Sequence, residues 1–583
     1  MEQNTVAPNY VIKDGMIIEW DVPIEMEDGI ILRADVYRPI AEGEYPVVLT
    51  YGPYAKGLAF QEAYPRQWNV MTSEHPDVEA GSTNKYQTWE AVDPEKWVPH
   101  DYVCVRVDSR GAGRSPGYLS PFSKRETQDY YNCIEWAGVQ PWSNGKVGLL
   151  GISYYAMNQW QVAALQPPHL AAMIPWEGSS DWYRDATHHG GIVSTFWETW
   201  LPQILTVQHG VGERGKVNPN NGVSVAGPDT LPESELEKNR TNLGWDIVSH
   251  PLANDEYYKE RQVDWSKVTV PLLSAANWGG IGLHSRGNFE GFKRAASTQK
   301  WLEVHGLEHW THFYTDYGVQ LQQRFFDHFL KGEDNGWDQE PPVLLNVRKV
   351  NDFTERKEQD WPLPRTEWKK LYLDLNNKGF TSEPSADRAT IAYKPLEEEV
   401  TLITEPHEKE VELTGPMAAK LFVSSATVDA DLFLTVRVFD PSGNEIVYSG
   451  AMDPRTPISQ GWLRASHRKL DPAESTFYQP YHSHDEIQPL TPDEVYELDI
   501  EIWPTSIVIP EGYRLGLTIG GKDYRNCTDE EGVKFHTKFM TGSGAYWHDD
   551  VRDRPEEIFG GKVNIHAGEG RNGYLLVPVI PEK

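Results

Sequence analysis

The fold of this chain is decided by the stretch Lys146-Val147-Gly148-Leu149-Leu150-Gly151-Ile152-Ser153-Tyr154-Tyr155. Its apolar run, residues 147–150, predicts a buried strand, and residues 154–165 are compatible with a helix. Ser153 therefore lies at a sharp strand-to-helix turn, which is the geometry of a nucleophile elbow. At such a turn the hydroxyl is held above the sheet, and the next backbone N–H, that of Tyr154, points to the place where an oxyanion forms. The usual second glycine, two residues after the serine, is Tyr155 here.

The rest of the chain predicts three kinds of structure around this elbow. Strand and helix patterns alternate through residues 1–180 and again through 266–350, which indicates a largely parallel sheet covered on both faces, an α/β class of fold. Residues 181–265 are rich in Trp, His, Asn and Gly and predict an inserted helical cap. Residues 351–583 carry many short strand patterns separated by turn residues, which is typical of a β-sandwich or jelly roll.

Composition limits the possible partners. The chain has 583 residues and a formal net charge of −32, from 86 acidic and 54 basic residues, which argues against nucleic acid or an anionic membrane as a partner. Its three cysteines are too few for a disulfide framework, and their spacing suits no zinc site. No run is long and apolar enough to cross a membrane. We expect a cytoplasmic protein that acts on a small molecule without metal or cofactor; a homo-oligomer remains open.

A serine nucleophile needs a base, and three histidines follow the last predicted core strand, residues 301–304. These are His305, His309 and His312, and His309 is favoured because a helix-forming segment begins shortly after it. Together with Glu308 the three histidines also suggest a metal site. No second ligand group has matching spacing, so we expect none.

Sequence motifs extend along almost the whole chain, at residues 52–56, 108–115, 140–148, 151–154, 180–184, 325–332 and 461–465. As a set they resemble those of the cocaine-esterase-like branch of the serine hydrolases, whose relatives include X-Pro dipeptidyl-peptidases and α-amino-acid ester hydrolases. The resemblance implies an α/β-hydrolase core with an inserted helical cap and a C-terminal jelly roll. It also implies Ser153 as nucleophile, His309 as base, and the Tyr54 hydroxyl as an oxyanion donor beside the Tyr154 N–H.

One position departs from the family pattern. The family places its triad aspartate after the penultimate core strand, and Gly280 stands there in this chain. Other α/β-hydrolases supply the acid after the strand that follows the nucleophile helix, here residues 171–175, and Glu177 comes directly after that strand. Because parallel strands end at one edge of the sheet, we predict that Glu177 binds the His309 ring.

Alternatives to this acid remain open. Glu308 is adjacent to His309 and Asp181 lies near the predicted cap, whereas Asn277 supplies no charge. Glu177 itself has a structural alternative, a salt bridge to Arg184 or Arg286.

Two classes of function follow. The first is a serine hydrolase that cleaves a carboxylic ester or amide through an acyl-enzyme. Its acyl group is bulky or aromatic, since the cap region is dense in aromatic residues; X-Pro dipeptidyl-peptidase or α-amino-acid ester hydrolase action is the alternative within this class. The second class is a catalytically inactive protein that binds its ligand through the β-sandwich, if the loss of the acid at Gly280 abolished catalysis.

Overall fold

A mixed sheet of eleven strands forms the core of the N-terminal part. The structure, a computed structural model, describes residues 10–581. Six neighbouring pairings, from β5–β4 through β11–β12, are parallel, and antiparallel strands flank them on both sides. The order across the sheet is β1 (Tyr10–Lys13), β2 (Met16–Glu25), β3 (Ile31–Pro39), β5 (Val103–Asp108), β4 (Tyr45–Gly52), β6 (Ser143–Ile152), β7 (Leu170–Trp176), β10 (Leu272–Asn277), β11 (Lys300–His305), β12 (Val343–Arg348) and β13 (Phe353–Glu358).

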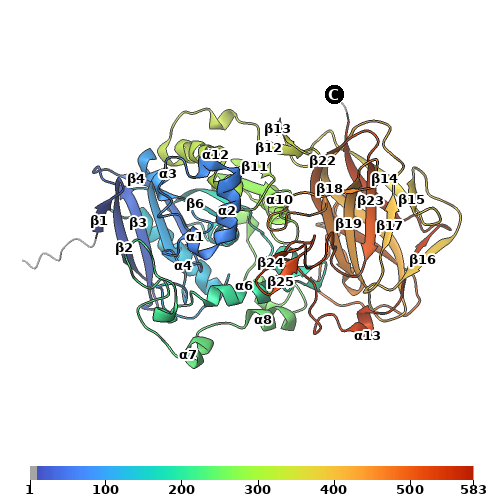
Figure 1. Ribbon diagram of the computed structural model, residues 1–583, viewed down its shortest axis with the longest axis horizontal. Coiled ribbons are helices and arrows are strands. Elements are labelled where there is room, and N and C mark those ends of the chain that lie inside the picture. The colour runs from blue at the N-terminus through green and yellow to red at the C-terminus, as the bar shows by residue number, and fades with distance from the viewer. Residues whose placement is uncertain (1–9, 582–583) are drawn as a thin grey trace, which may run out of the picture.

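Helices cover this sheet and follow its strands in the order that the sequence predicts. They pack on both faces, as Figure 1 shows for the blue-to-green part of the chain. The helices that pack along the sheet are α4 (Lys124–Gly138), α5 (Tyr154–Ala163), α10 (Ser285–Arg294) and α12 (Asp316–Phe326). Within residues 10–581, none of the helices combines the length and the apolar character needed to cross a membrane.

An insertion of short helices separates β7 from β10 along the chain, although the two strands are neighbours in the sheet. This insertion contains α6 (Phe196–Leu205), α7 (Glu233–Lys238), α8 (Leu243–Ser249) and α9 (Glu256–Lys259), together with a two-stranded ribbon, β8 (His188–His189) and β9 (Ile192–Val193). Their aromatic side chains join the main apolar core rather than forming a separate one: Phe196, Trp197 and Trp200 belong to the same buried cluster as Tyr154. The insertion therefore forms one wall above the carboxyl edge of the sheet.

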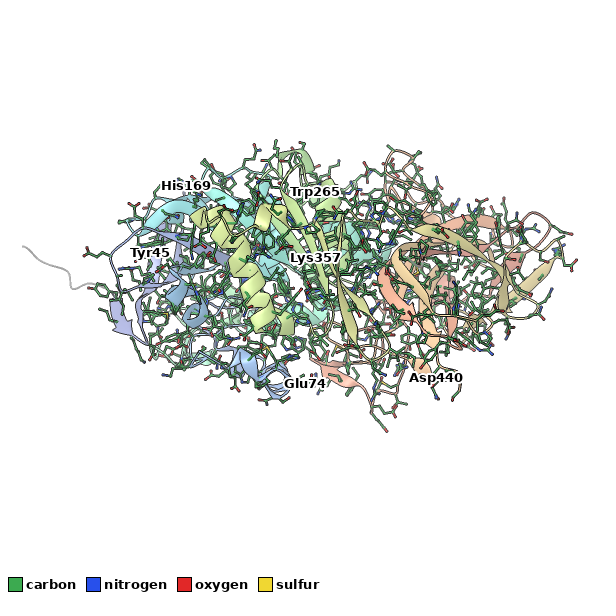
Figure 2. All side chains as sticks on the ribbon, turned by 90° about the horizontal axis from the view of Figure 1, so that it is seen from above. Tyr45, Glu74, His169, Trp265, Lys357 and Asp440 are labelled. Carbon is green, nitrogen blue, oxygen red and sulfur yellow. The ribbon has the colours of Figure 1, made fainter. Side chains whose placement is uncertain are left out.

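The C-terminal part is built from antiparallel strands. Its twelve-stranded sheet includes the long strands β18 (Val411–Ser425), β19 (Asp431–Phe439), β22 (Tyr496–Ile509) and β23 (Arg514–Gly520), and it has its own apolar core. Figure 1 shows this β-rich domain beside the core, and Figure 2 shows side chains filling the space between the two. The α/β-hydrolase core and the β-rich C-terminal domain confirm the predicted fold class. The domain bounds and the jelly-roll strand arrangement stay predictions.

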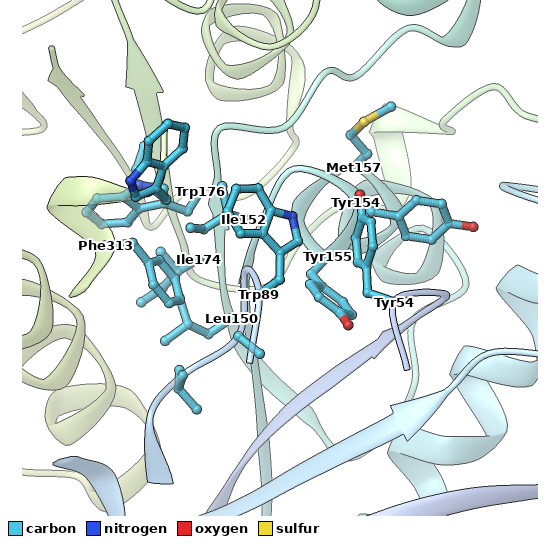
Figure 3. Close-up of a cluster of buried hydrophobic side chains, with 14 of the residues drawn as sticks. Tyr54, Trp89, Leu150, Ile152, Tyr154, Tyr155, Met157, Ile174, Trp176 and Phe313 are labelled. Atoms are coloured by element: carbon cyan, nitrogen blue, oxygen red, sulfur yellow. The ribbon is translucent and has the colours of Figure 1, made fainter. Parts of the chain in front are cut away.

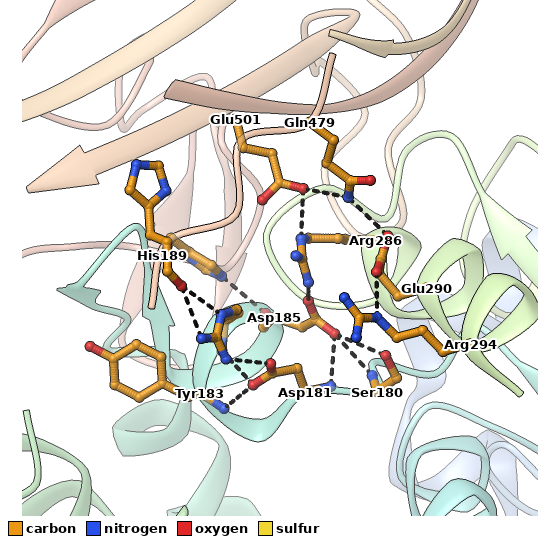
Figure 4. Close-up of polar contacts among 12 residues, drawn as sticks. Ser180, Asp181, Tyr183, Asp185, His189, Arg286, Glu290, Arg294, Gln479 and Glu501 are labelled. Atoms are coloured by element: carbon orange, nitrogen blue, oxygen red, sulfur yellow. Dashed lines mark hydrogen bonds and ion pairs between the residues drawn. The ribbon is translucent and has the colours of Figure 1, made fainter. Parts of the chain in front are cut away.

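A buried ionic network joins the core, the insertion and the C-terminal domain. Arg286 on α10 donates to Asp185 over 2.7 Å and to Glu501 on β22 over 2.9 Å (Figure 4). Arg184 pairs with Asp181 and donates to two backbone carbonyls of the C-terminal domain. Charges removed from water need such partners. Both arginines are thus bound to other carboxylates than Glu177, which excludes the salt-bridge alternative for that residue.

Candidate active site

Ser153 lies between β6 and α5 in a conformation that only the surrounding structure can maintain. Its φ is 56° and its ψ is −111°, and a non-glycine residue in such a region costs on the order of 1–3 kcal/mol. Its N–H donates to the carbonyls of Trp176, over 3.1 Å, and Glu177, over 3.2 Å. A Cβ added at Gly151 would lie 2.4 Å from the Tyr155 Cβ, so only glycine fits there. The strained turn is the predicted elbow.

The imidazole that contacts Ser153 belongs to His284. Its Nε2 lies 2.9 Å from Ser153 Oγ, and its Nδ1 has no hydrogen-bond partner among the described residues although the ring is buried. Burial, together with the nearby charge of His309, lowers the pKa of His284 to about 3, so the ring is neutral. A buried N–H without an acceptor is rarer than a buried unpaired acceptor. We therefore assign the proton to Nε2, so that His284 donates to Ser153 Oγ.

His309 is stacked on His284 and bound by two carboxylates. The ring centroids are 5.0 Å apart with an interplanar angle of 17°. His309 Nδ1 lies 3.3 Å from Glu177 Oε2, and its Nε2 lies 2.7 Å from Glu90 Oε1. Although burial opposes a charge on the ring, these hydrogen bonds raise the pKa of His309 to about 9. At neutral pH, His309 is an imidazolium held between Glu177 and Glu90.

Glu177 is the centre of this arrangement. Its Oε1 accepts from Asn277 Nδ2 over 3.1 Å and lies 2.9 Å from His305 Nε2, while Oε2 faces His309. Burial alone would raise the pKa of this carboxyl, but the contacts with His305 and His309 lower it to about 2. His305 is also bound by Glu303, and the two carboxylates raise its pKa to about 10 in spite of its burial.

The structure thus brings together some of the predicted residues and separates others. Ser153 and His309 line one pocket, and Glu177, which does not line it, contacts the His309 ring as the sequence analysis expects. The Nε2 of His309 is bound by Glu90 rather than by Ser153, however, because His284 fills the position beside Ser153 Oγ.

The remaining candidates have other partners. Glu308 accepts from the hydroxyls of Thr311 and Ser449, and Asp181 caps the helical turn that begins at Trp182. His312 makes ring contacts with His305 and Tyr317. None of these side chains is placed on the His309 ring.

Tyr54 and Tyr154, the predicted oxyanion donors, both line the pocket that contains Ser153. α5 begins at Tyr154, and the N–H groups of a first helical turn have no acceptor within the helix. The Tyr54 hydroxyl lines the same pocket as Ser153 and accepts from Trp200 Nε1 over 3.2 Å. Burial raises the pKa of Tyr54 well above its usual value, so the phenol keeps its proton.

The pocket around Ser153 is apolar and small. Its free volume is about 40 Å³. Figure 3 shows Trp89, Tyr154, Met157 and Tyr54 gathered in the buried cluster at this site. Met452, Phe535 and Tyr546 of the C-terminal domain complete the wall. His309 also donates its backbone N–H to Ala451 of that domain, over 3.0 Å.

Three of these side chains also suit a metal ion by their chemistry. Glu177, His284 and His309 each offer a ligand atom, and the three atoms lie within 4.8 Å of one another. Two imidazoles and one carboxylate are a ligand set that zinc accepts. Without a metal, the three groups interact with one another: Glu177 is hydrogen-bonded to His309, and His309 is stacked on His284. Glu177 is also bound by two further side chains, Asn277 and His305.

Sequence reasoning missed His284 and Glu90. His284 directly precedes α10, in a segment without a recognisable motif, and Glu90 lies in an irregular loop with a φ of 61°. An unusual φ at a non-glycine residue is visible only in the structure. The one available signal was the loop after β10, where the resemblance implied an aspartate and Gly280 stands, four residues before His284.

Comparison with known proteins places the chain among the hydrolases. Residues 28–314 match the family described as X-Pro dipeptidyl-peptidase (S15 family), and residues 335–528 match the C-terminal non-catalytic domain of X-Pro dipeptidyl-peptidase. A CocE/NonD family hydrolase from Staphylococcus aureus superposes with a TM-score of 0.83 at 34% identity, over 98% of this chain and 96% of that one. Cocaine esterase from Rhodococcus sp. (strain MB1 Bresler) is 25% identical over 96% of this chain and 98% of its own length. An α-amino-acid ester hydrolase shares the fold, with a TM-score of 0.67 at 16% identity over 99% of each chain.

Proposed function

This chain belongs to the CocE/NonD family of hydrolases and is a serine hydrolase that cleaves ester or amide bonds, and we propose that Ser153 is its nucleophile. The observation that carries the proposal is Ser153 Oγ at a strained elbow, 2.9 Å from an imidazole and facing an apolar pocket. Attack by this hydroxyl on the substrate carbonyl forms an acyl-enzyme, which water then hydrolyses. The Tyr154 N–H and the Tyr54 hydroxyl stabilise the oxyanion of each step.

We propose His309, oriented by Glu177, as the base. A base needs a carboxylate on its far nitrogen and must itself be neutral to accept the serine proton. His309 has that carboxylate and becomes neutral as the pH approaches about 9, whereas His284 Nδ1 has no partner among the described residues. To reach Ser153, His309 Nε2 must exchange its contact with Glu90 for one with the hydroxyl. Catalytic hydrogen bonds often tighten only when substrate binds. In this scheme His284 donates to Ser153 Oγ and positions it.

The walls of the pocket support a carboxylic ester with a bulky apolar or aromatic acyl group as the substrate. Eight apolar side chains from α5, the insertion, the loop before α10 and the C-terminal domain surround the nucleophile: Met157, Phe196, Trp197, Trp200, Leu283, Met452, Phe535 and Tyr546. Such surfaces favour burial of apolar groups at about 25 cal/mol per Å². The free volume is small, so binding requires these side chains to move apart.

Peptidase action is a second candidate. Glu90 favours it, because its carboxyl lines the pocket and Oε2 has no hydrogen-bond partner among the described residues. Its Oε1 is bound by His309, so Oε2 is the oxygen that could accept a hydrogen bond from the α-ammonium group of a peptide substrate. Rates on Gly-Pro and Ala-Pro anilides, beside a panel of phenylacetyl, benzoyl and acetyl esters, separate the two candidates. Faster cleavage of the anilides would replace the ester proposal.

A fluorophosphonate probe tests the nucleophile. It should label the wild-type protein and leave Ser153→Ala unlabelled, with Ser120→Ala, a change at a serine outside the pocket, as the control. Ester hydrolysis by Ser153→Ala should fall by about 10³-fold or more. Equal labelling of wild type and Ser153→Ala would contradict the assignment.

The same ester-hydrolysis assay distinguishes the roles of His309 and His284. His309→Ala should lose about 10³-fold or more in kcat, as triad members do. His284→Ala should lose less, since it removes a positioning contact rather than the proton acceptor. The reverse ranking would make His284 the base.

A further inference from the structure

A large groove continues outward from the pocket that contains Ser153. Its free volume is about 740 Å³, compared with about 40 Å³ beside the nucleophile. Tyr54, Tyr64 and Gln203 line both spaces, so these three side chains form the boundary between them. The groove is lined by α6 and by residues of the segment 206–216, with Leu58 and Ala63 on the facing side. A substrate held at Ser153 can extend past Gln203 into this space.

The charges of the groove are unusual for so acidic a protein. Arg214 and Lys216 line its outer part, both are exposed, and neither forms an ion pair with any described residue. Arg214 donates to the Leu231 carbonyl over 2.6 Å, and Lys216 donates to the Glu62 carbonyl. These backbone contacts orient the two side chains without neutralising them.

The other ionisable side chains of the groove do not offset these cations. Glu198 is bound by Arg552, so its negative charge is compensated. Burial lowers the pKa of His536, which is therefore neutral at pH 7. In a chain with a net charge of −32, the groove that leads to the nucleophile thus has two uncompensated positive charges.

We propose that this groove binds the alcohol half of the ester and that Arg214 and Lys216 recognise a carboxylate on that half. The inference rests on the proposed function, in which the apolar pocket takes the acyl half. These two cations line the groove but not the pocket of the nucleophile, so they attract an anion on the far part of the substrate. The planar guanidinium of Arg214 matches a carboxylate in shape. The substrate class is therefore an ester with an apolar acyl group and an anionic alcohol part.

Two matched esters test this specificity. Phenylacetic acid is esterified with 4-(hydroxymethyl)benzoate or with 4-(hydroxymethyl)benzamide, which differ in charge but hardly in the leaving group. Wild-type kcat/KM should favour the anionic ester by about fivefold to tenfold, which corresponds to two exposed charge contacts. The preference should appear mainly in KM and decline with added salt.

Variants assign the preference to the groove. Arg214→Ala with Lys216→Ala should bring the ratio of the two kcat/KM values close to one, and Arg214→Glu with Lys216→Glu should invert it. Arg388→Glu with Lys522→Glu changes the net charge by the same amount at two exposed sites that do not line the groove. This control should keep the wild-type ratio.

The outcomes separate the inference from the proposed function. If both esters are cleaved and the ratio is the same in wild type and in the groove variants, the carboxylate site is refuted while the hydrolase proposal stands. If the wild-type protein cleaves neither ester and the probe does not label Ser153, both proposals fall. A ratio that changes equally in the control variants would also overturn the inference, because it would show an effect of net charge alone.

Discussion

At the scale of the residue, the chemistry of the site depends on Glu177. Its carboxylate is buried and still ionised, because His305 and His309 hold its pKa at about 2. The same carboxylate helps to keep His309 charged until the pH approaches about 9. Glu177 thus contributes to the raised pKa of two histidines, together with Glu90 at His309 and Glu303 at His305.

Replacing Glu177 by glutamine should reduce kcat by about 10²–10⁴-fold. The amide keeps the shape of the side chain but cannot stabilise an imidazolium, and it favours the wrong tautomer of His309. The pKa of His309 should fall as well, since one of its two carboxylates is lost. The pH–rate profile should therefore move its rising limb to lower pH. Steady-state kinetics between pH 6 and 10 check both effects.

A suitable control for this variant is Glu308→Gln, which changes a nearby carboxylate that does not contact the His309 ring. If Glu308→Gln lost as much activity as Glu177→Gln, Glu177 would not be the acid of the reaction.

At the scale of the element, the close contact between β7 and α5 places the acid beside the nucleophile. Gly178 directly follows Glu177, and a Cβ added there would lie 2.7 Å from the Ala156 Cβ and 3.0 Å from the Met157 nitrogen on α5. The helix backbone cannot yield as a flexible side chain can. The end of β7 and the first turn of α5 therefore need glycine at this position.

Replacing Gly178 by alanine should destabilise the protein by about 1–3 kcal/mol, as overpacking does, and should reduce activity by moving Glu177. Gly520→Ala is the matched control, because its added methyl would meet the Glu399 Cβ at an ordinary 3.5 Å. Denaturant unfolding and ester hydrolysis measure the two effects. Equal stability of the two variants would show that β7 and α5 are less tightly packed than described.

At the scale of the whole molecule, buried histidines gather where the insertion meets the C-terminal domain. His189 Nδ1 lies 2.7 Å from His548 Nε2, and His467 Nδ1 lies 3.0 Å from His484 Nδ1. Burial, with the nearby His548, lowers the pKa of His189 to about 3, and burial lowers the pKa of His467 to about 3 as well. His189 and His467 are therefore neutral in the folded protein and gain a proton on unfolding once the pH is below about 6.5.

Thermal stability should therefore fall as the pH is lowered below about 6.5. The unfolded chain then binds more protons than the folded one, and each such histidine costs about 1.4 kcal/mol per pH unit. His189→Gln removes one of these groups, so the fall in Tm between pH 7.5 and 5.5 should be smaller than in wild type. Scanning calorimetry measures this difference. His100→Gln, at an exposed histidine, should behave like wild type; an unchanged fall in His189→Gln would contradict the account.

The sequence by itself determined the parts that depend on local pattern. The apolar run 147–150, with Gly151 and Ser153, was enough to predict the elbow, because strand and helix periodicity is a property of neighbouring residues. The contact between Glu177 and His309 was also predictable, since parallel strands end at one edge of the sheet.

Only the tertiary structure decided which imidazole contacts Ser153 and what surrounds it. His284 and Glu90 are 131 and 219 residues away from their partners Ser153 and His309, and neither lies in a motif. The groove depends in the same way on α6 and on loops that pack against residues far away in the sequence. Local pattern specifies the elements and their order. The direction of side chains from irregular loops follows from the packing of all the elements together, so it becomes known only when the chain is folded.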